Sequence, residues 1–412
     1  MLEFMDYIQH AFYNATRWNY ENSYSHLTTT ARGKQSPQCS WFAPLTIKDL
    51  LDFETPRGLR LNISSLSSPN FATSYALGSV GFVDGSLSYL YTTLPLKSTS
   101  QSGNIDLHDV IRGYRQIQEL RKPDDSRDWE EWLGGRRVDK RDSLLYGQLY
   151  LPQSTLEALY LRRMSPTSQL RLSAVSDGRL KNGGTMLALY QYDVGKYNAE
   201  TLYSTDGGLI GLRGLYNFGP DPRREAREPP RLEDRIYGRF SAGGEMYYGS
   251  LNKSGGVSFG GRFATLPAHR GIPLTATLTV NPLMGNLSTT YAVKAGKDLA
   301  LCSKFDFNVY SYESEVVVGW ELWRMRAKAE QKRERSMAAK LGWRLDEVEE
   351  SLIPKPEAVA GVFKARVDQN WKIRLLWEGR MKELLFTLGS SIDMKRRDQP
   401  FQMLGMEIKY SS

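Results

Sequence analysis

The amino-acid sequence predicts an all-β protein: a transmembrane β-barrel of about nineteen mostly antiparallel strands, with a short N-terminal helix and three long loop inserts. From Gly58 onwards, runs of roughly ten residues alternate apolar and polar side chains and end in turns rich in Gly, Asn, Asp, Ser or Pro. No stretch reaches the roughly 20 apolar residues of a membrane-spanning helix. The mean hydropathy of -0.46 still permits a barrel, because only every second strand residue must face lipid.

Residues 1–57 are predicted to form a helical and irregular segment that precedes the barrel, which we expect to occupy residues 58–412. Apolar residues of this segment recur at helical spacing: Leu2, Met5, Ile8 and Phe12. That spacing indicates a short amphipathic helix, which we expect to dock on its own barrel rather than on the membrane surface. The start carries acidic residues and no basic n-region, so it matches neither a secretory signal nor a matrix presequence.

The barrel pattern begins where Leu59, Leu61 and Ile63 alternate with polar residues. Asp84-Gly85 and Asp206-Gly207 are dipeptides typical of hairpin turns, and we expect a turn at each. Further alternating runs cover residues 87–91, 186–194, 197–203, 210–216, 236–242, 257–263, 274–280, 287–293, 299–309, 359–367, 371–377, 384–392 and 404–410. Weaker runs lie near residues 71–83, 145–151, 155–163, 167–176 and 312–323. A closed sheet is expected, because closure removes free strand edges, and no blade-length repeat supports a soluble β-propeller.

Three inserts interrupt the strands, at residues 95–144, 218–234 and 324–357. The first carries a helical apolar spacing at Leu107, Val110, Ile111, Tyr114 and Ile117. The second is too rich in proline and charge to fold alone. The third is expected to place a charged helix over the mouth of the barrel.

Basic side chains concentrate in the third insert, at Arg324, Arg326, Lys328, Lys332, Arg333, Arg335, Lys340 and Arg344. A solvated helix face explains such a run, and contact with a partner protein or with anionic lipid explains it as well. Direct nucleic-acid binding is disfavoured, although the chain has a net charge of +8, because no aromatic stacking platform accompanies the run. These eight residues are therefore the candidates for partner or lipid contact.

Motifs of catalytic, cofactor and metal sites find little support. The string Gly256-Val257-Ser258-Phe259-Gly260 has the spacing of a hydrolase nucleophile elbow, but it lies inside an alternating strand rather than at a strand-to-helix turn. The four histidines are isolated in sequence, and no phosphate-binding loop is present. The two cysteines, Cys39 and Cys302, are expected to be free thiols. We therefore expect no catalytic residue, no cofactor and no metal.

Three segments of the chain resemble one family: MLEFMDYIQHAFYNATRWNYENSYSHLTTTARGKQSP at the start, TPRGLRLNISSLSSPNFATSY in the first strand, and LGMEIKYSS at the end. The chain is similar to the fungal mitochondrial distribution and morphology barrels, outer-membrane subunits of the ER-mitochondria encounter structure. The resemblance covers essentially the whole length. It implies a nineteen-stranded barrel of the mitochondrial outer membrane, with the N-terminal segment in or near the lumen.

The resemblance also implies function and partners. It implies a non-enzymatic scaffold at ER-mitochondria contact sites, which anchors a tethering complex supporting phospholipid exchange. It further implies membership of the sorting and assembly machinery, late in the assembly of outer-membrane β-barrel proteins. The expected partners are subunits of both complexes and outer-membrane lipid. Effects on mitochondrial morphology and genome inheritance would follow from these memberships.

The last strand is comparable with the mitochondrial β-signal, the targeting motif of barrel proteins. Gly405, Ile408 and Tyr410 fit its last three fixed positions. Met403 stands where the motif has a polar residue, and Gln402 lies one residue early, so the match is imperfect. An odd number of strands also makes the first and last strands parallel, and this weaker seam is a candidate opening or partner site.

Two other functions remain as alternatives to the scaffold. A metabolite channel similar to the voltage-dependent anion channel needs an open lumen and short loops, whereas the inserts of this chain are long. A membrane-embedded enzyme needs a nucleophile and a base on adjacent strands, and the sparse histidines give it the least support.

Overall fold

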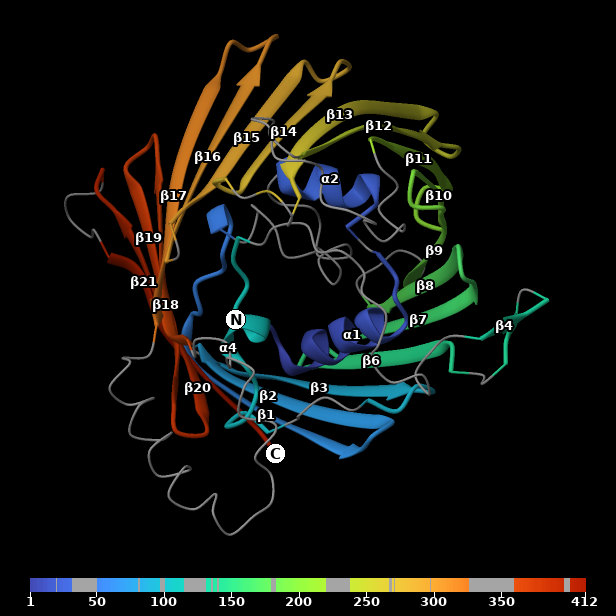
Figure 1. The fold of residues 1–412 in the computed structure, drawn as a ribbon. Helices are drawn as coiled ribbons and strands as arrows, with labels where there is room; N and C mark the ends of the chain where they lie inside the picture. Colours follow the sequence, from blue (N-terminus) through green and yellow to red (C-terminus); the bar gives the residue numbers. More distant parts are fainter. Residues whose placement is uncertain are drawn as a thin grey trace.

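The computed structural model confirms the predicted fold class: nineteen strands close into one barrel, seen nearly end-on in Figure 1. Neighbouring strands are antiparallel except for β1 (Gly58–Ser68) and β21 (Phe401–Ser411), which pair in parallel and close the ring. The structure describes the chain except for residues 20, 32–49, 81, 97–100, 115–130, 135, 139–140, 179–182, 220–237, 267–268, 270, 297, 326–358 and 396–400.

The other strands of the barrel are β2 (Phe71–Val80), β3 (Phe82–Thr92), β6 (Ser143–Leu151), β7 (Thr155–Ser165), β8 (Ser168–Ser176), β9 (Gly184–Asp193), β10 (Tyr197–Ser204), β11 (Leu209–Phe218), β12 (Gly238–Gly249), β13 (Ser254–Thr265), β14 (Leu274–Asn281), β15 (Asn286–Ala295), β16 (Leu299–Asn308), β17 (Ser314–Met325), β18 (Val359–Asp368), β19 (Lys372–Met381) and β20 (Leu384–Asp393). A separate hairpin pairs β4 (Trp132–Leu133) with β5 (Arg136–Arg137). The helices are α1 (Phe4–Ala15), α2 (Tyr24–Ala31) and the short α4 (Leu107–Val110).

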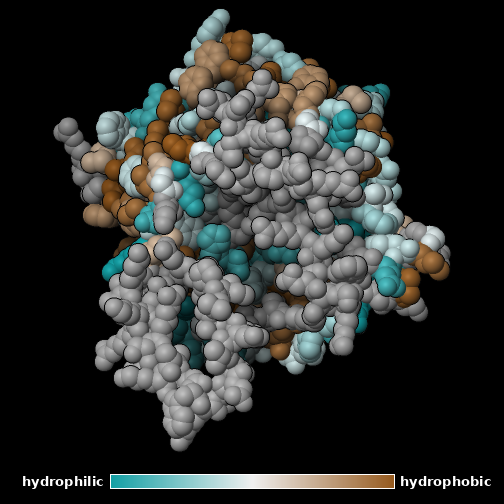
Figure 2. Space-filling model, in the orientation of Figure 1, coloured by the Kyte–Doolittle hydropathy of each residue, from teal (hydrophilic) through white to brown (hydrophobic). Residues whose placement is uncertain are grey.

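The two faces of the wall differ in polarity, as strand alternation requires. Apolar side chains such as Leu59 and Phe259 point outward and are 53% and 55% exposed. Polar side chains such as Asn62, Glu245 and Arg262 point inward and are buried. Figure 2 shows brown, hydrophobic side chains on the outside of the ring and teal, hydrophilic ones toward its centre, where grey atoms do not cover them. An apolar outer band around a polar interior is the surface pattern of a barrel in lipid.

The strand ends that flank the three inserts all lie at the same mouth of the barrel. Thr92, Phe218 and Met325 are the last residues of β3, β11 and β17. Between Thr92 and Phe218 the chain passes through six antiparallel strands, β6–β11, and between Phe218 and Met325 it passes through six more, β12–β17. An even number of antiparallel strands returns the chain to the same end of the barrel, so all three strand ends lie there. We call this end the insert mouth. Ser411 of β21 also lies there, and its carbonyl accepts a hydrogen bond of 3.1 Å from the backbone N–H of Ser102. The opposite end, with short connections such as 205–208 and 282–285, is called the turn mouth.

Two expectations about local structure were wrong. The turn between β2 and β3 lies next to Val80, whereas Asp84-Gly85 is inside β3, where Gly85 pairs with Leu77. Pairing with β2 along the whole length of β3 therefore overrides the local turn preference of this dipeptide. The helix in the first insert is a single turn that ends at Val110, because Ile111 is already extended, with ψ 123°. The charged helix expected over the barrel mouth and the second insert fall outside the described residues.

No helix in the described part of the chain is long and apolar enough to cross a membrane.

Candidate functional site

The lumen contains the N-terminal segment, and α1 rests on an apolar patch of the inner wall. Figure 1 shows α1 inside the ring, beside β6 and β7. Met5, Ile8 and Phe12, one turn apart on one helix face, are buried there. Their wall partners are inward-facing apolar residues on β2, β3, β6 and β7: Ala72, Leu90, Leu144, Tyr146, Leu159 and Leu161. The inner wall is thus apolar where α1 packs against it.

The chain after α1 is fixed by an aromatic contact. The hydroxyl of Thr16 donates to the Phe12 carbonyl at 2.9 Å and ends the helix. The indole of the buried Trp18 lies under the guanidinium of Arg163, 4.7 Å from ring centroid to Cζ. A desolvated cation over an indole face stabilises such a contact by about 2 kcal/mol.

The second lumen helix, α2, packs on a polar part of the wall. The Tyr24 hydroxyl lies 3.2 Å from the hydroxyl of Ser258, which in turn donates to Glu245 at 2.6 Å. His26 Nδ1 lies 2.8 Å from a guanidinium nitrogen of Arg262, and it accepts, because Arg262 has only donors. Burial lowers the pKa of His26 well below its usual value, and the nearby Arg262 charge acts in the same direction.

Before α2, Asn22 joins a hydrogen-bond network that crosses from the segment to the wall. Its amide donates 2.6 Å to Asp193 and 3.0 Å to the Gly195 carbonyl, and it accepts from Asn217. These groups are buried and satisfy one another's hydrogen-bonding capacity. The network therefore holds the segment at one position on the wall.

Segment 50–57 runs along the inner wall from β17 and β18 to β21, at the seam with β1. Arg366 of β18 donates 2.7 Å to the Leu51 carbonyl and pairs with Asp52. Further along, the backbone of Pro56 passes directly over Gly405 of β21, and a Cβ at that position would overlap the Pro56 carbonyl. Glycine at 405 is therefore required by the close approach of the segment to the strand.

The targeting candidates lie together on β21, at the seam. Gly405, Ile408 and Tyr410 pair in parallel with Gly58, Leu61 and Ile63 of β1. Gly405 faces the lumen, whereas Ile408 and Tyr410 share the outward-facing parity. Their role as a targeting signal stays a prediction.

Of the eight basic candidates, only Arg324 is described. It is exposed near the end of β17, at the insert mouth, and pairs with Gly361. The other seven lie outside the described residues, so the structure does not bring this set together. Its role in partner or lipid contact remains a prediction.

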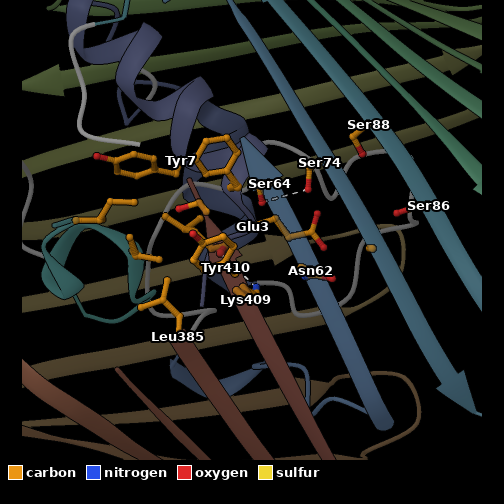
Figure 3. A pocket seen from close by; sticks show the side chains of 16 residues that line it. Glu3, Tyr7, Asn62, Ser64, Ser74, Ser86, Ser88, Leu385, Lys409 and Tyr410 are labelled. Atoms are coloured by element: carbon orange, nitrogen blue, oxygen red, sulfur yellow. Dashed lines mark hydrogen bonds between the residues drawn. The ribbon is translucent and has the colours of Figure 1, made fainter. Parts of the chain in front are cut away.

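A small cavity of about 30 Å³ lies between the N-terminal residues and the inner wall at the seam (Figure 3). Hydroxyls of Ser64, Ser74, Ser86 and Ser88 line its wall side. Leu2, Phe4, Tyr7, Ile105, Val110 and Leu385 give it an apolar side. In Figure 3 the side chain of Glu3 extends from the N-terminal segment toward Asn62 of β1. The cavity therefore has a polar side and an apolar side.

Charged residues join the N-terminal segment to the wall and to the first insert. Glu378 pairs with the amino group of Met1 and with Lys364 at 2.8 Å, and all three groups are buried. Arg112, after α4, pairs with Asp6 of α1 at 2.6 Å. These contacts hold the N-terminal segment to the wall and to the first insert.

The glycine string and the described cysteine are part of the barrel wall. Gly256–Gly260 lies within β13, which confirms its interpretation as strand, and a Cβ at Gly260 would lie 2.5 Å from Leu27 of α2. Cys302 is a buried free thiol, and Cys39 lies outside the described residues. Among described residues, no group of three His, Cys, Asp or Glu side chains is placed to hold a metal ion.

The charged residues that hold the lumen segment, notably Lys364, Arg366, Glu378 and Lys409, were not among the predicted site residues. A signal for them was present, since each occupies the polar parity of its strand. The apolar parity alone predicts the strands, whereas the partners of these charges are distant in sequence.

Comparison with known proteins identifies the family. The family model described as mitochondrial distribution and morphology protein 10 matches residues 1–358 and 329–412. Proteins of that description from Sclerotinia sclerotiorum and Phaeosphaeria nodorum are 73% and 60% identical, each over all of both chains. One from Neurospora crassa is 44% identical, again with full coverage of both chains. The chain therefore belongs to the mitochondrial distribution and morphology protein 10 family.

Proposed function

We propose that the chain is a non-enzymatic scaffold of the mitochondrial outer membrane. In this proposal it anchors an ER-mitochondria tethering complex that supports phospholipid exchange, and it takes part in late assembly of outer-membrane β-barrel proteins. Family membership supports a role in mitochondrial distribution and morphology, and the family is one of structural rather than known catalytic proteins. Effects on mitochondrial shape and genome inheritance follow from the two memberships.

The proposal rests mainly on one observation: the three inserts lie at the same end of the barrel. The three inserts all join strands at the insert mouth, so the material available for specific contacts is on one side of the membrane. The apolar outer face supports insertion in lipid, and it leaves the mouths as the polar surfaces for water-soluble partners. A membrane anchor with one elaborated end is suited to holding a complex on a single side.

A channel similar to the voltage-dependent anion channel is the second candidate. A polar cavity of about 600 Å³ near the turn mouth favours it, lined by Thr28 of α2 and by residues such as Lys304, Asp306 and Asn308. Against it, α1 and α2 are packed inside the ring. Single-channel recording in planar bilayers separates the two candidates, since the scaffold predicts a lower conductance than that of a barrel of this size with an open lumen.

The test of the scaffold is a crosslinking pull-down of the intact protein from outer membranes, with partners identified by mass spectrometry. Tether subunits together with barrel-assembly subunits are the expected result. A barrel recovered alone, or only with copies of itself, contradicts the proposal.

A deletion variant locates the contact surface. Removal of residues 326–350 is expected to leave the barrel inserted and to weaken one of the two partner complexes, because the flanking strands β17 and β18 pair with each other without that segment. Tyr312→Ser is the matched control, since Tyr312 is 81% exposed at the turn mouth. Loss of insertion in the deletion variant, or equal loss of partners in the control, counts against the assignment.

A further inference from the structure

The first insert carries a small hairpin that is separate from the barrel sheet. Its strand β4 pairs with β5 and with no other strand in the part of the chain that the structure describes. The backbone N–H of Val138 donates 3.0 Å to the Glu131 carbonyl and adds one pair at the base. Because successive strand residues point to opposite faces, Trp132 and Arg137 share one face of the hairpin, and Leu133 and Val138 share the other.

The face with Trp132 and Arg137 is turned toward the barrel wall. Cζ of Arg163, on β7, lies 5.9 Å from the centroid of the Trp132 ring, a distance at which a cation and an aromatic face attract each other. Arg137 is buried, and its guanidinium donates 2.8 Å to the Arg141 carbonyl, just before β6. The backbone N–H of Arg163 donates 2.8 Å to the Asp142 carbonyl. These contacts hold the base of the hairpin at the rim of the insert mouth.

The opposite face of the hairpin is apolar and exposed. Leu133 is 79% exposed and Val138 is 57% exposed. They are diagonal neighbours across the two strands, so their side chains form one apolar surface. In Figure 1 the hairpin extends outward past β7, beyond the outline of the ring, and Figure 2 shows brown atoms at the same right-hand edge. The apolar face therefore lies outside the barrel wall, not over the lumen.

The rim beside the hairpin is at the depth of a membrane interface. β6 has nine residues and β7 has eleven, and a tilted strand of about 9–11 residues crosses the hydrocarbon core, so both strands end at its border. Arg162, on the outward side of β7 near this end, is exposed and pairs with Asp142 at 3.4 Å. A cation on the lipid-facing side of a strand reaches for the headgroups, which places their level beside residues 142 and 162.

We propose that the β4–β5 hairpin lies in the membrane interface, where Leu133 and Val138 enter the border between lipid headgroups and acyl chains. The outer wall favours lipid as the occupant, because Leu145 and Met164 continue its exposed apolar surface up to the rim beside the hairpin. Trp132 adds an amphipathic ring of the kind that is enriched at this depth. The proposal rests on the placement of the barrel in a membrane, and it adds a lipid contact made by the first insert.

The experiment places a nitrobenzoxadiazole fluorophore on single cysteines of the full chain, with Cys39→Ser, reconstituted in phosphatidylcholine vesicles. Leu133→Cys is the test position. Leu278→Cys, on the lipid-facing side of β14, reports the wall, and Gln101→Cys, exposed in the first insert, reports water. A chain without an added cysteine measures any label on the buried Cys302. Quenching by doxyl-labelled lipid is compared with quenching by aqueous iodide.

The label at Leu133 is expected to be quenched by doxyl lipid, to resist iodide, and to emit at a shorter wavelength than the label at Gln101. Val138→Asp in the chain labelled at Leu133 should restore quenching by iodide, because a carboxylate disfavours the acyl region. Leu251→Asp, at an exposed apolar residue of the turn mouth, is the matched control and should leave the quenching unchanged. Equal quenching by iodide at Leu133 and Gln101, or equal effects of the two aspartates, overturns the proposal.

The label at Leu278 separates this proposal from the membrane placement on which it rests. Doxyl quenching at Leu278 together with iodide quenching at Leu133 means that the barrel is embedded and that the hairpin is in water, so the hairpin proposal alone fails. The apolar face would then be left for a protein partner. Absence of doxyl quenching at both positions means that the barrel is not embedded, and both proposals fail.

Discussion

Truncation of Phe12 tests whether α1 is held in the lumen by apolar packing. The Phe12 side chain is 0% exposed and packs against Leu90, Leu144 and Leu161 of the inner wall. Phe→Ala at a fully buried position costs about 3–5 kcal/mol, from lost transfer free energy and from the cavity left behind. The cost falls on the docked state of α1, because the released helix exposes residue 12 whether it is Phe or Ala.

Hydrogen exchange measured by mass spectrometry on residues 4–15 reads out this docking. A loss of 3 kcal/mol lowers the protection of α1 amides by more than about a hundredfold, at 1.4 kcal/mol for each factor of ten. Asn14→Ala is the matched control, since Asn14 is exposed on the same helix and its truncation leaves the packing intact. Equal protection in Phe12→Ala and Asn14→Ala would refute the apolar docking of α1.

Two further predictions concern the seam and α2. Gly405→Ala should lower the free energy of unfolding in urea by at least about 1–3 kcal/mol, because the new Cβ overlaps the Pro56 backbone, whereas Gly147→Ala, with its nearest neighbour 3.9 Å away, should change it little. Equal effects of the two changes would exclude the steric argument. Because the folded-state pKa of His26 is lowered, stability should fall as pH drops below the unfolded value of about 6.5, by up to about 1.4 kcal/mol per pH unit. His26→Asn keeps an acceptor for Arg262 and should flatten this dependence in urea titrations at several pH values; an unchanged slope contradicts it.

The strand count and the closed sheet could be predicted because each strand carries its own two-residue alternation. The alternation of Leu59, Leu61 and Ile63 predicts the outward face of the first strand without information from any other strand. The prediction of a turn at Asp84-Gly85 was wrong because it used the local preference of the dipeptide alone. Pairing of the whole of β3 with β2 places these two residues inside the strand.

The contents of the lumen were only partly predictable. The spacing of Met5, Ile8 and Phe12 indicates a docked helix, but the docking surface is built from residues on β2, β3, β6 and β7. Inward-facing leucines at 90 and 144 are the sequence trace of that surface, since they interrupt an otherwise polar parity. The cavity beside Asn62 has no such trace, because it forms where residues near both ends of the chain meet.

The even number of strands between inserts has a consequence for how this protein can change over evolution. Residues added to or lost from an insert alter no register in the wall, because β11 still pairs with β12 and β17 with β18. Loss or duplication of a whole hairpin also keeps every later insert on its side. The gain or loss of an odd number of strands would reverse the orientation of everything that follows, and it would also replace the parallel seam by an antiparallel one. Insert length is thus free to vary among lineages, while the parity of the strand count is not.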